Sequence, residues 1–282
     1  MTASPTGPDF AAPGARVCYR HSDRETGIAC QRCGRGICGE CMNPASVGFQ
    51  CPRCVGLGRA TGREPRTRFG ARVGRGRGSA TTTLMVVLAV VYVLNFATRG
   101  LVQGPLLMWN PAVAGGQLWR LVTSGFVSGS LLGLAMNLLV LHLAGRAIES
   151  EVGAARFVAI YLAGALGGST LFYLLGPADG ATIGGASAVV GLLAANAIGK
   201  RRGGEDVRGD VALFVILVLY SLLVGFNSFG WLTMIGGILV GALAGWVLAY
   251  APRTNRSAIQ AFGLLAVVGV CLVAVVVPTF IG

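Results

Sequence analysis

The sequence predicts an all-α protein that crosses a membrane several times and carries a small cysteine-rich domain near its N-terminal end. Of its 282 residues, 54% are hydrophobic and only 12% are charged, and the mean hydropathy is +0.68. A soluble domain averages about 25% charged residues. Seven of the eight cysteines lie between residues 18 and 54, ahead of the long apolar runs. This composition excludes an ordinary soluble globule, and it excludes a disordered chain, which would be poor in apolar residues.

From residue 81 onward, long apolar runs alternate with short polar breaks. A helix needs about 20 mostly apolar residues to cross the hydrocarbon of a bilayer. The seven expected spans are 82–98, 126–146, 154–176, 182–199, 211–226, 231–250 and 258–280. On the sixth span Gly237, Gly241 and Gly245 recur every four residues, which predicts a smooth face for close packing against a neighbouring helix.

Basic residues are distributed unevenly between the connections, and this distribution predicts the orientation in the membrane. With the N-terminus in the cytoplasm, only Arg99 and Arg120 fall on the opposite side. The cytoplasmic connections then hold Arg146, Arg156, Lys200, Arg201, Arg202, Arg208, Arg253 and Arg256. We expect a plasma-membrane protein with a cytoplasmic N-terminus and an external C-terminus. No signal peptide is expected, because residues 1–17 have no apolar core.

The cysteine-rich segment contains four pairs of candidate metal ligands, and two residues separate the members of each pair. The pairs are Cys18 with His21, Cys30 with Cys33, Cys38 with Cys41, and Cys51 with Cys54. Such a pair grips one metal ion from a tight turn, so eight ligands suit two structural Zn²⁺ ions. Only four residues separate the second and third pairs, which disfavours their closing on one ion. We therefore expect interleaving, with Cys18, His21, Cys38 and Cys41 on one ion and Cys30, Cys33, Cys51 and Cys54 on the other.

A disulfide framework and an iron–sulfur cluster are the alternatives to zinc. Seven cysteines leave one unpaired, and the cysteine-rich segment is expected in the cytoplasm, which is a reducing compartment. Disulfides are therefore disfavoured. An iron–sulfur cluster requires neither four regular pairs nor a histidine. The pattern over residues 18–54 resembles the B-box and RING-like cross-braced zinc fingers. We expect the zinc to be structural, and we expect the finger to recruit a cytosolic protein.

Residues 55–80 are rich in arginine and glycine and lead into the first span. Residues 1–80 hold 13 arginines and five acidic residues, so eight of the twelve net positive charges lie there. Nucleic-acid binding is one interpretation, but Phe69 is the only aromatic residue of the segment and stacking platforms are missing. We favour a tether whose arginines contact anionic lipids, each contributing about 1 kcal/mol near the surface. These arginines are Arg59, Arg63, Arg66, Arg68, Arg72, Arg75 and Arg77.

Several short motifs of the membrane part occur in a recognisable order. They are Trp119-Arg120 in the first loop, Asn137 and Gly145-Arg146-Ala-Ile-Glu149 on the second span, Gly167-Gly168 on the third, Gly184 before the fourth, and Gly236-Gly237 with Gly241 on the sixth. Over about residues 80–250 they resemble the rhomboid family of intramembrane serine proteases. The resemblance implies a rhomboid-like six-helix bundle, here followed by a seventh C-terminal span. A zinc finger ahead of such a domain is familiar in bacterial relatives.

The expected domains follow from these boundaries. They are a disordered N-terminus (1–17), a two-zinc finger (18–54), an Arg/Gly-rich juxtamembrane linker (55–80), a rhomboid-like six-span domain (81–250) and a seventh transmembrane helix (256–282).

The residues that rhomboid catalysis requires are replaced at the matching positions. In the family, the serine of a GxSG motif on the fourth span is the nucleophile, a sixth-span histidine is its base, and a second-span histidine and asparagine help form the oxyanion hole. A match without gaps places Ala186 at the nucleophile, Met234 at the base and Gly133 at the second-span histidine, and it keeps Asn137. A one-residue slip would make Ser187 the nucleophile, but it turns the side chain about 100° around the helix. A hydroxyl is a weak nucleophile without a base, and methionine accepts no proton.

Two functions therefore remain open. The favoured one is a catalytically inactive pseudoprotease that binds transmembrane segments of client proteins. The alternative is an active intramembrane serine endopeptidase that uses Ser187 with a non-standard base such as His142. We expect His142 instead to be neutral and bonded to a neighbouring helix. Transport is disfavoured, because no carboxylate is expected to be buried on a span.

The remaining ionisable side chains of interest are expected at the membrane surface. Arg120 is expected to anchor the first loop at the interface. Glu149 and Glu151 are expected in an exposed turn, in ion pairs with Arg146 and Arg156.

Overall fold

The computed structural model describes residues 16–61, 67, 69, 79–225, 229–252 and 255–281. The chain divides into two compact units, residues 1–64 and residues 65–282. Most of the expected disordered N-terminus lies outside the described residues. So do six arginines of the expected tether, at positions 63, 66, 68, 72, 75 and 77.

The N-terminal unit consists of two short antiparallel hairpins and one helix. Its elements are β1 (Arg16–Val17) paired with β2 (Glu25–Thr26), the 3₁₀ turn η1 (Gly39–Cys41), β3 (Asn43–Pro44) paired with β4 (Phe49–Gln50), and α1 (Pro52–Thr61). The buried cluster of this unit consists of six cysteines and the fully buried Ile37. So small an apolar core contributes little to the stability of a domain.

The second unit is a helical bundle in which helices form at all seven expected spans. The long elements are α2 (Ser79–Ala97), the continuous span of α6 (Leu131–Val140), η3 (Leu141–Gly145) and α7 (Arg146–Val152), α8 (Ala154–Leu175), α9 (Gly185–Gly203), α10 (Arg208–Gly225), α11 (Gly230–Tyr250) and α12 (Arg256–Ile281). Among the described residues, five helices are long and apolar enough to cross a membrane: α2, α6 to α7, α8, α11 and α12. The chain is thus a multi-pass helical membrane protein.

The second span begins later than expected, at Leu131 instead of 126. Ser130 ends the preceding loop by accepting a hydrogen bond from the Gly133 N–H at 3.0 Å, as an N-cap residue does. The long connection before it contains α3 (Gln103–Leu106), β5 (Met108–Trp109), α4 (Asn110–Ala114), α5 (Arg120–Thr123) and η2 (Ser124–Phe126). Strand β5 pairs with β6 (Ala181–Thr182), which leads into α9.

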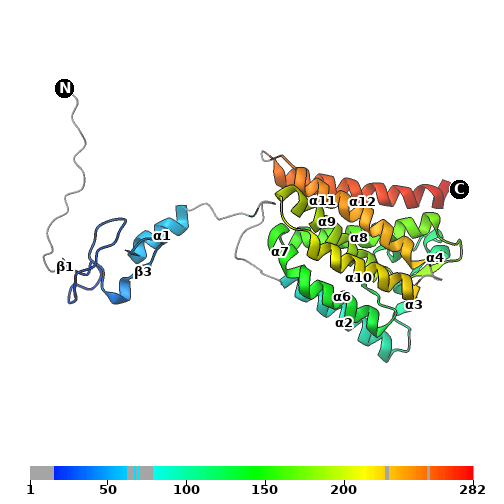
Figure 1. Cartoon of the computed structure of the whole chain (residues 1–282), viewed down its shortest axis with the longest axis horizontal. Helices are drawn as coiled ribbons and strands as arrows, with labels where there is room; N and C mark the ends of the chain where they lie inside the picture. The colour runs from blue at the N-terminus through cyan, green and yellow to red at the C-terminus, as the bar shows by residue number, and fades with distance from the viewer. Residues whose placement is uncertain are drawn as a thin grey trace, which may run out of the picture. The chain divides into compact units, whose positions relative to one another are not determined.

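Helices α8, α9 and α11 form the centre of the bundle, while α2 (cyan) and α12 (red) lie on opposite sides of it (Figure 1). Gly237, Gly241 and Gly245 face the backbone of α9 so closely that a Cβ on any of them would collide with it. The predicted packing face of the sixth span is therefore confirmed, and glycine is required there because two helix backbones meet. Helix α12 packs on α8 and α11, and the Tyr173 hydroxyl lies 2.8 Å from the Thr279 hydroxyl.

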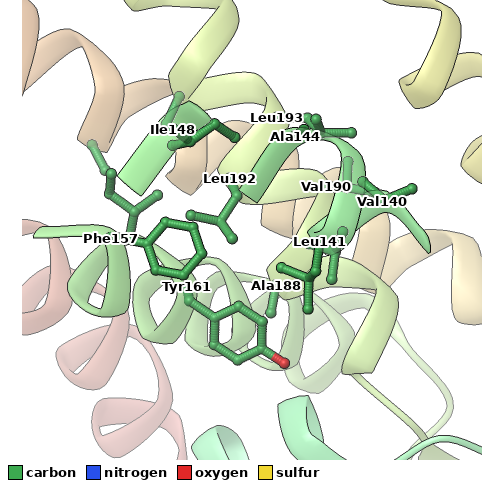
Figure 2. Close-up of a cluster of buried hydrophobic side chains, with 14 of the residues drawn as sticks. Val140, Leu141, Ala144, Ile148, Phe157, Tyr161, Ala188, Val190, Leu192 and Leu193 are labelled. Carbon is green, nitrogen blue, oxygen red and sulfur yellow. The ribbon is translucent and has the colours of Figure 1, made fainter. Parts of the chain in front are cut away.

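The second span presents one face to this centre. Val140, Leu141, Ala144 and Ile148 form one buried cluster with Phe157 and Tyr161 of α8 and with apolar side chains of α9 (Figure 2). These residues are all buried. The opposite face of the same helix is exposed in the bundle and includes His142.

Glu149 was expected in an exposed turn with ion pairs to arginine. The structure shows that it is buried, with 2% of its surface exposed. Its carboxylate accepts hydrogen bonds from the Thr81 N–H at 2.8 Å, the Thr81 hydroxyl at 2.7 Å and the Ala80 N–H at 3.1 Å. These donors belong to the first turn of α2, where the helix has unpaired N–H groups and a partial positive charge. Glu149 therefore caps the first span from the end of the second.

Arg120 was expected to anchor the first loop at the membrane interface. The structure instead shows a buried side chain that connects parts of this loop. Its guanidinium donates to the Gly104 carbonyl at 2.7 Å, the Leu107 carbonyl at 2.9 Å and the Gln117 side chain at 2.7 Å. Arg120 thus supplies hydrogen-bond donors to two loop carbonyls, those of Gly104 and Leu107, in a segment of irregular backbone.

The expectation that no carboxylate is buried on a span is also wrong. Besides Glu149, Asp210 of α10 is buried and lies 2.7 Å from the Lys200 ammonium of α9. Asp210 also accepts a hydrogen bond from Asn196 at 3.0 Å. Both carboxylates are paired at helix ends, which is a structural arrangement and not a path for ions.

Candidate metal centres and membrane cavity

The first set of candidate ligands surrounds the imidazole of His21. Its Nδ1 lies 3.3 Å from the Cys38 sulfur, 3.5 Å from Cys41 and 3.9 Å from Cys18. All four ligand atoms lie within 4.8 Å of one another. β1 and β2 hold the ends of the first turn together, while Cys38 immediately precedes η1 and Cys41 is its last residue. Three sulfurs and one imidazole nitrogen form a Cys₃His donor set.

The second set consists of Cys30, Cys33, Cys51 and Cys54, whose sulfurs also lie within 4.8 Å of one another. The Cys51 N–H donates to the Cys30 sulfur at 3.2 Å, and the Cys54 N–H donates to the Cys51 sulfur at 3.4 Å. Cys54 lies in the first turn of α1. The structure thus brings together the two interleaved sets predicted from the sequence.

The backbone around these thiols favours the thiolate form that binds metals. Burial raises the pKa of Cys18 and of Cys30, but backbone N–H donors outweigh it and lower each pKa to about 6. By contrast, burial and the neighbouring Cys18 and Cys38 sulfurs raise the pKa of Cys41 to about 11. Sulfurs this close cannot all be anionic without a cation between them. The donor sets therefore fit a divalent, thiophilic metal ion, and no further ligand position is needed.

The membrane unit contains a cavity of about 410 Å³ between the loop before α6, the start of α9, and helices α10 and α11. Its lining residues are Gln103, Leu107, Val127, Ser128, Gly129, Ser130, Gly133, Asn137, Ala181, Thr182, Ile183, Gly185, Ala186, Leu217, Tyr220, Gly230 and Thr233. We call this the α9 cavity. No histidine, carboxylate, lysine or arginine is among these described residues.

Ala186 and Ser187 differ in where they point. Ala186 is half-buried and lines the α9 cavity. Ser187 is fully buried, does not line the cavity, and donates its hydroxyl to the Gly184 carbonyl at 2.6 Å. A Cβ on Gly168 of α8 would lie 2.6 Å from that hydroxyl, so Ser187 sits at the packing contact between α8 and α9.

Of the buried polar side chains that line the cavity, Asn137 and Ser128 have polar groups of interest for binding. Asn137 is 4% exposed, and its amide nitrogen would lie 3.2 Å from a Cβ on Gly185. Ser128 is 6% exposed, and its hydroxyl has no hydrogen-bond partner among the described residues. Such groups suit a carbonyl oxygen brought in by another chain. The sequence indicated Asn137 through the family pattern, whereas nothing in the sequence singled out Ser128.

The side chains expected at the base position do not face the cavity. Met234 is buried in the apolar core and does not line it, while its neighbour Thr233 lines it and donates to the Gly230 carbonyl at 2.7 Å. His142 lies on the exposed face of the second span. The expected bond from His142 to a neighbouring helix is absent within the described residues.

A hydrogen bond also closes the side of the cavity between the second and fifth spans. The Ser130 hydroxyl lies 3.2 Å from the Tyr220 hydroxyl of α10. The sequence analysis did not indicate this contact, because its two residues lie 90 positions apart.

These features define a class, the multi-pass helical membrane proteins whose bundle contains a cavity lined by apolar and a few polar side chains. Residues 115–251 match the family model of the rhomboid domain. The chain is 26% identical over 153 residues to RHOMBOID-like protein 6, mitochondrial, of Arabidopsis thaliana, covering 53% of this chain and 50% of that protein. It is 30% identical over 144 residues to Rhomboid-like protease 3 of Toxoplasma gondii, covering 50% and 54%. It is 30% identical over 173 residues to Rhomboid protease GluP of Bacillus subtilis (strain 168), covering 60% and 32%.

The chain belongs to the rhomboid family. It spans about half the length of the first two of these curated relatives. The matched residues begin after α4 and end just beyond α11, so α2, α12 and the cysteine-rich unit lie outside them.

Proposed function

We propose that this protein is a rhomboid pseudoprotease, which binds transmembrane segments of client proteins and does not cleave them. The observation that carries the proposal is the methyl group of Ala186, which faces the α9 cavity beside Asn137 where a nucleophile would have to stand. Met234, at the position of the base, is 3% exposed in the apolar core.

The loss of both groups removes the two central requirements of serine hydrolysis. A nucleophilic hydroxyl needs a base within hydrogen-bond reach, and the cavity lining offers no histidine or carboxylate. Where a triad is removed from a serine protease, the oxyanion hole and binding leave only about 10³–10⁴-fold acceleration over water. Ser187 does not rescue the chemistry, because its hydroxyl is engaged with Gly184 inside a helix contact.

The features retained are those that bind a chain. Asn137 and Ser128 offer polar groups to a peptide carbonyl. The Ser130–Tyr220 hydrogen bond is the polar contact that a segment entering between α6 and α10 would replace. In hydrocarbon, a helix break leaves carbonyls without partners, so a client segment with such a break gains most from these groups.

The test reconstitutes the purified chain with a transmembrane substrate that contains a helix-destabilising Gly-Pro pair, beside a rhomboid protease that cleaves it. We expect binding of the substrate, no cleavage, and no labelling by a fluorophosphonate. Cleavage or labelling that disappears in both Ser187→Ala and His142→Ala would overturn the proposal and establish an active serine endopeptidase. Ser187→Gly serves as a second variant, because it too removes the hydroxyl.

We further propose that both cysteine sets bind Zn²⁺, which stabilises the N-terminal unit, and that this unit recruits a cytosolic protein. Four-coordinate sulfur and nitrogen sets suit zinc, and no position is left for a reactive water. Metal analysis of the protein purified without added metal is expected to find two zinc ions per chain. Iron with a visible charge-transfer band would contradict this assignment.

We also propose a plasma-membrane location with the N-terminus inside and the C-terminus outside, and an arginine tether that contacts anionic lipids. The distribution of basic residues supports the orientation. Phe69 is buried against Gly199, which leaves no free aromatic residue for base stacking among the described residues of the linker. Fusions of alkaline phosphatase to each terminus test the orientation, and activity at the N-terminal fusion would contradict it.

A further inference from the structure

One buried hydroxyl in the lining of the α9 cavity has no hydrogen-bond partner. Ser128 is 6% exposed, and its Oγ makes no hydrogen bond within the described residues. By contrast, the hydroxyls of Ser130, Tyr220 and Thr233 in the same lining all have partners. A hydroxyl carries one donor and two acceptor sites, and a buried polar group that stays unpaired costs free energy. Ser128 therefore favours a ligand that brings a hydrogen-bonding group into the cavity.

The backbone on either side of Ser128 is packed against the residues that lead into α9. A Cβ on Gly185 would lie 2.7 Å from the Val127 carbonyl oxygen, and a Cβ on Gly129 would lie 2.9 Å from the Cδ1 atom of Ile183. Contacts this close leave the loop little freedom to move. The loop packing thus holds the Ser128 hydroxyl in the wall of the cavity.

The rest of the lining limits which group the ligand can bring. Among the described lining residues there is no histidine, carboxylate, lysine or arginine to neutralise a charge. An ionised side chain in the cavity would lose its hydration without gaining a counter-ion. An apolar side chain of the same size would leave the Ser128 hydroxyl unpaired. An uncharged hydroxyl or amide side chain avoids both costs.

The hydroxyl of Ser128 further favours a ligand that donates a hydrogen bond. A peptide carbonyl only accepts, so it would use the Ser128 O–H and leave both acceptor sites of Oγ unused. A hydroxyl or amide side chain can donate to these sites, whereas an ionised carboxylate cannot. Gly129, Gly133, Gly185 and Ala186 leave room for such a side chain, because none presents more than a methyl group to the cavity of about 410 Å³.

We infer that the α9 cavity selects client segments that carry an uncharged hydrogen-bond donor, the side chain of serine, threonine or asparagine, at the helix break, and that Ser128 determines this selection. The inference rests on the proposed function and names the client chemistry that the same cavity accepts. A site with a buried polar group rejects an analogue that leaves this group unpaired. A water molecule bonded to Ser128 is the competing occupant, and it predicts no such selection.

The test uses the purified full chain in phosphatidylcholine vesicles and a labelled transmembrane peptide with a Gly-Pro break. The position directly before the break carries threonine, valine, asparagine or aspartate. Threonine and valine have nearly the same shape and differ in the hydroxyl, whereas asparagine and aspartate differ in charge. Energy transfer to the labelled protein measures binding.

We expect the threonine peptide to bind about three- to fifteenfold more tightly than the valine peptide, which is the range that one interhelical hydrogen bond in lipid allows. At neutral pH the asparagine peptide is expected to bind at least about tenfold more tightly than the aspartate peptide, because an ionised carboxylate is excluded. This second difference is expected to shrink as the pH falls, since a protonated carboxyl group is uncharged and donates.

The variants assign the preference to Ser128. Ser128→Ala removes the hydroxyl and is expected to bind the threonine and valine peptides equally, while Ser128→Thr restores a hydroxyl and the preference. Ser150→Ala is the matched control, because Ser150 is exposed on α7 and its hydroxyl donates to the Ala147 carbonyl at 2.8 Å, outside the cavity. The readout is the ratio of the two binding constants, since a variant that is only less stable weakens both peptides alike.

Equal binding of the threonine and valine peptides by the wild type, or a preference that persists in Ser128→Ala, would overturn the inference. Ala186→Phe and the milder Ala186→Leu fill the cavity, and circular dichroism confirms that they fold. A preference that survives in either variant would also overturn the inference, because the selection would then arise outside the cavity.

Failure of the proposed function gives a different result. Binding without cleavage and without preference refutes this inference alone. Cleavage of the threonine peptide refutes the pseudoprotease, whereas a preference that depends on Ser128 still supports the inference. If none of the peptides binds, both are refuted.

Discussion

Replacing Glu149 with alanine removes the carboxylate that joins the first and second spans. Three donors of Ala80 and Thr81 bond to it at 2.7–3.1 Å, and Thr81 is fully buried. A hydrogen bond to a charged group contributes about 1.5–3 kcal/mol, and the loss of a helix N-cap costs about 0.5–2 kcal/mol. Because these contributions overlap, we expect Glu149→Ala to lower the free energy of unfolding by about 3–5 kcal/mol.

The effect is measured by equilibrium unfolding in mixed dodecyl maltoside and SDS micelles, followed by far-ultraviolet circular dichroism. Asp179→Ala removes an exposed carboxylate in the loop between α8 and β6 and is the matched control, with an expected change within about 0.5 kcal/mol. Thr81→Val deletes one donor, and its double-mutant cycle with Glu149→Ala is expected to give a coupling energy of about 1–2 kcal/mol. A Glu149→Ala protein within 1 kcal/mol of the wild type would refute the assigned capping role.

Gly241→Ala is expected to destabilise the bundle by about 1–3 kcal/mol because the added methyl collides with α9. Gly269→Ala, whose Cβ meets nothing within 4 Å, should instead stabilise α12 slightly. Unfolding curves of both variants measure the effect, and equal shifts in Gly241→Ala and Gly269→Ala would contradict the prediction. Arg120→Met leaves two loop carbonyls without donors and is expected to lower the free energy of unfolding by about 2–4 kcal/mol. Protease cleavage in the loop before α5 is the readout, and a loop that stays uncleaved would contradict this role of Arg120. Cys38→Ser is expected to reduce bound metal from two ions to one per chain by emission spectrometry, while Cys271→Ser keeps both; equal metal contents would argue against the assigned ligands.

The two sets of candidate metal ligands were predictable because each depends on short-range spacing along the chain. Each pair, such as Cys30 with Cys33, is set by a two-residue turn, and the short gap before Cys38 disfavours closing adjacent pairs on one ion. The packing role of Gly241 was also readable, because a recurrence of every four residues places glycines on one helix face. In both cases the spacing along the chain already determines the distance in space.

The roles of Glu149 and Arg120 were not predictable from their neighbours in sequence. Glu149 bonds to residues 68 and 69 positions earlier, and Arg120 bonds to carbonyls 13 and 16 positions earlier. A charged residue at the end of an apolar run looks the same in sequence whether it meets water or a helix terminus. Which of these occurs depends on how the helices associate.

The sequence by itself predicted helices at all seven apolar runs, of which five are long and apolar enough to cross a membrane among the described residues. It also predicted the glycine face of α11 and the grouping of the cysteine and histidine side chains, because hydrophobic length and short-range spacing set each of them. Only the tertiary structure decided that Ala186 and not Ser187 faces the cavity, since one residue of helical rotation separates them and the neighbouring α8 and α11 settle the rotation. It also decided that His142 faces outward, because the side of the second span that packs against the core is the one that carries Leu141 and Ala144.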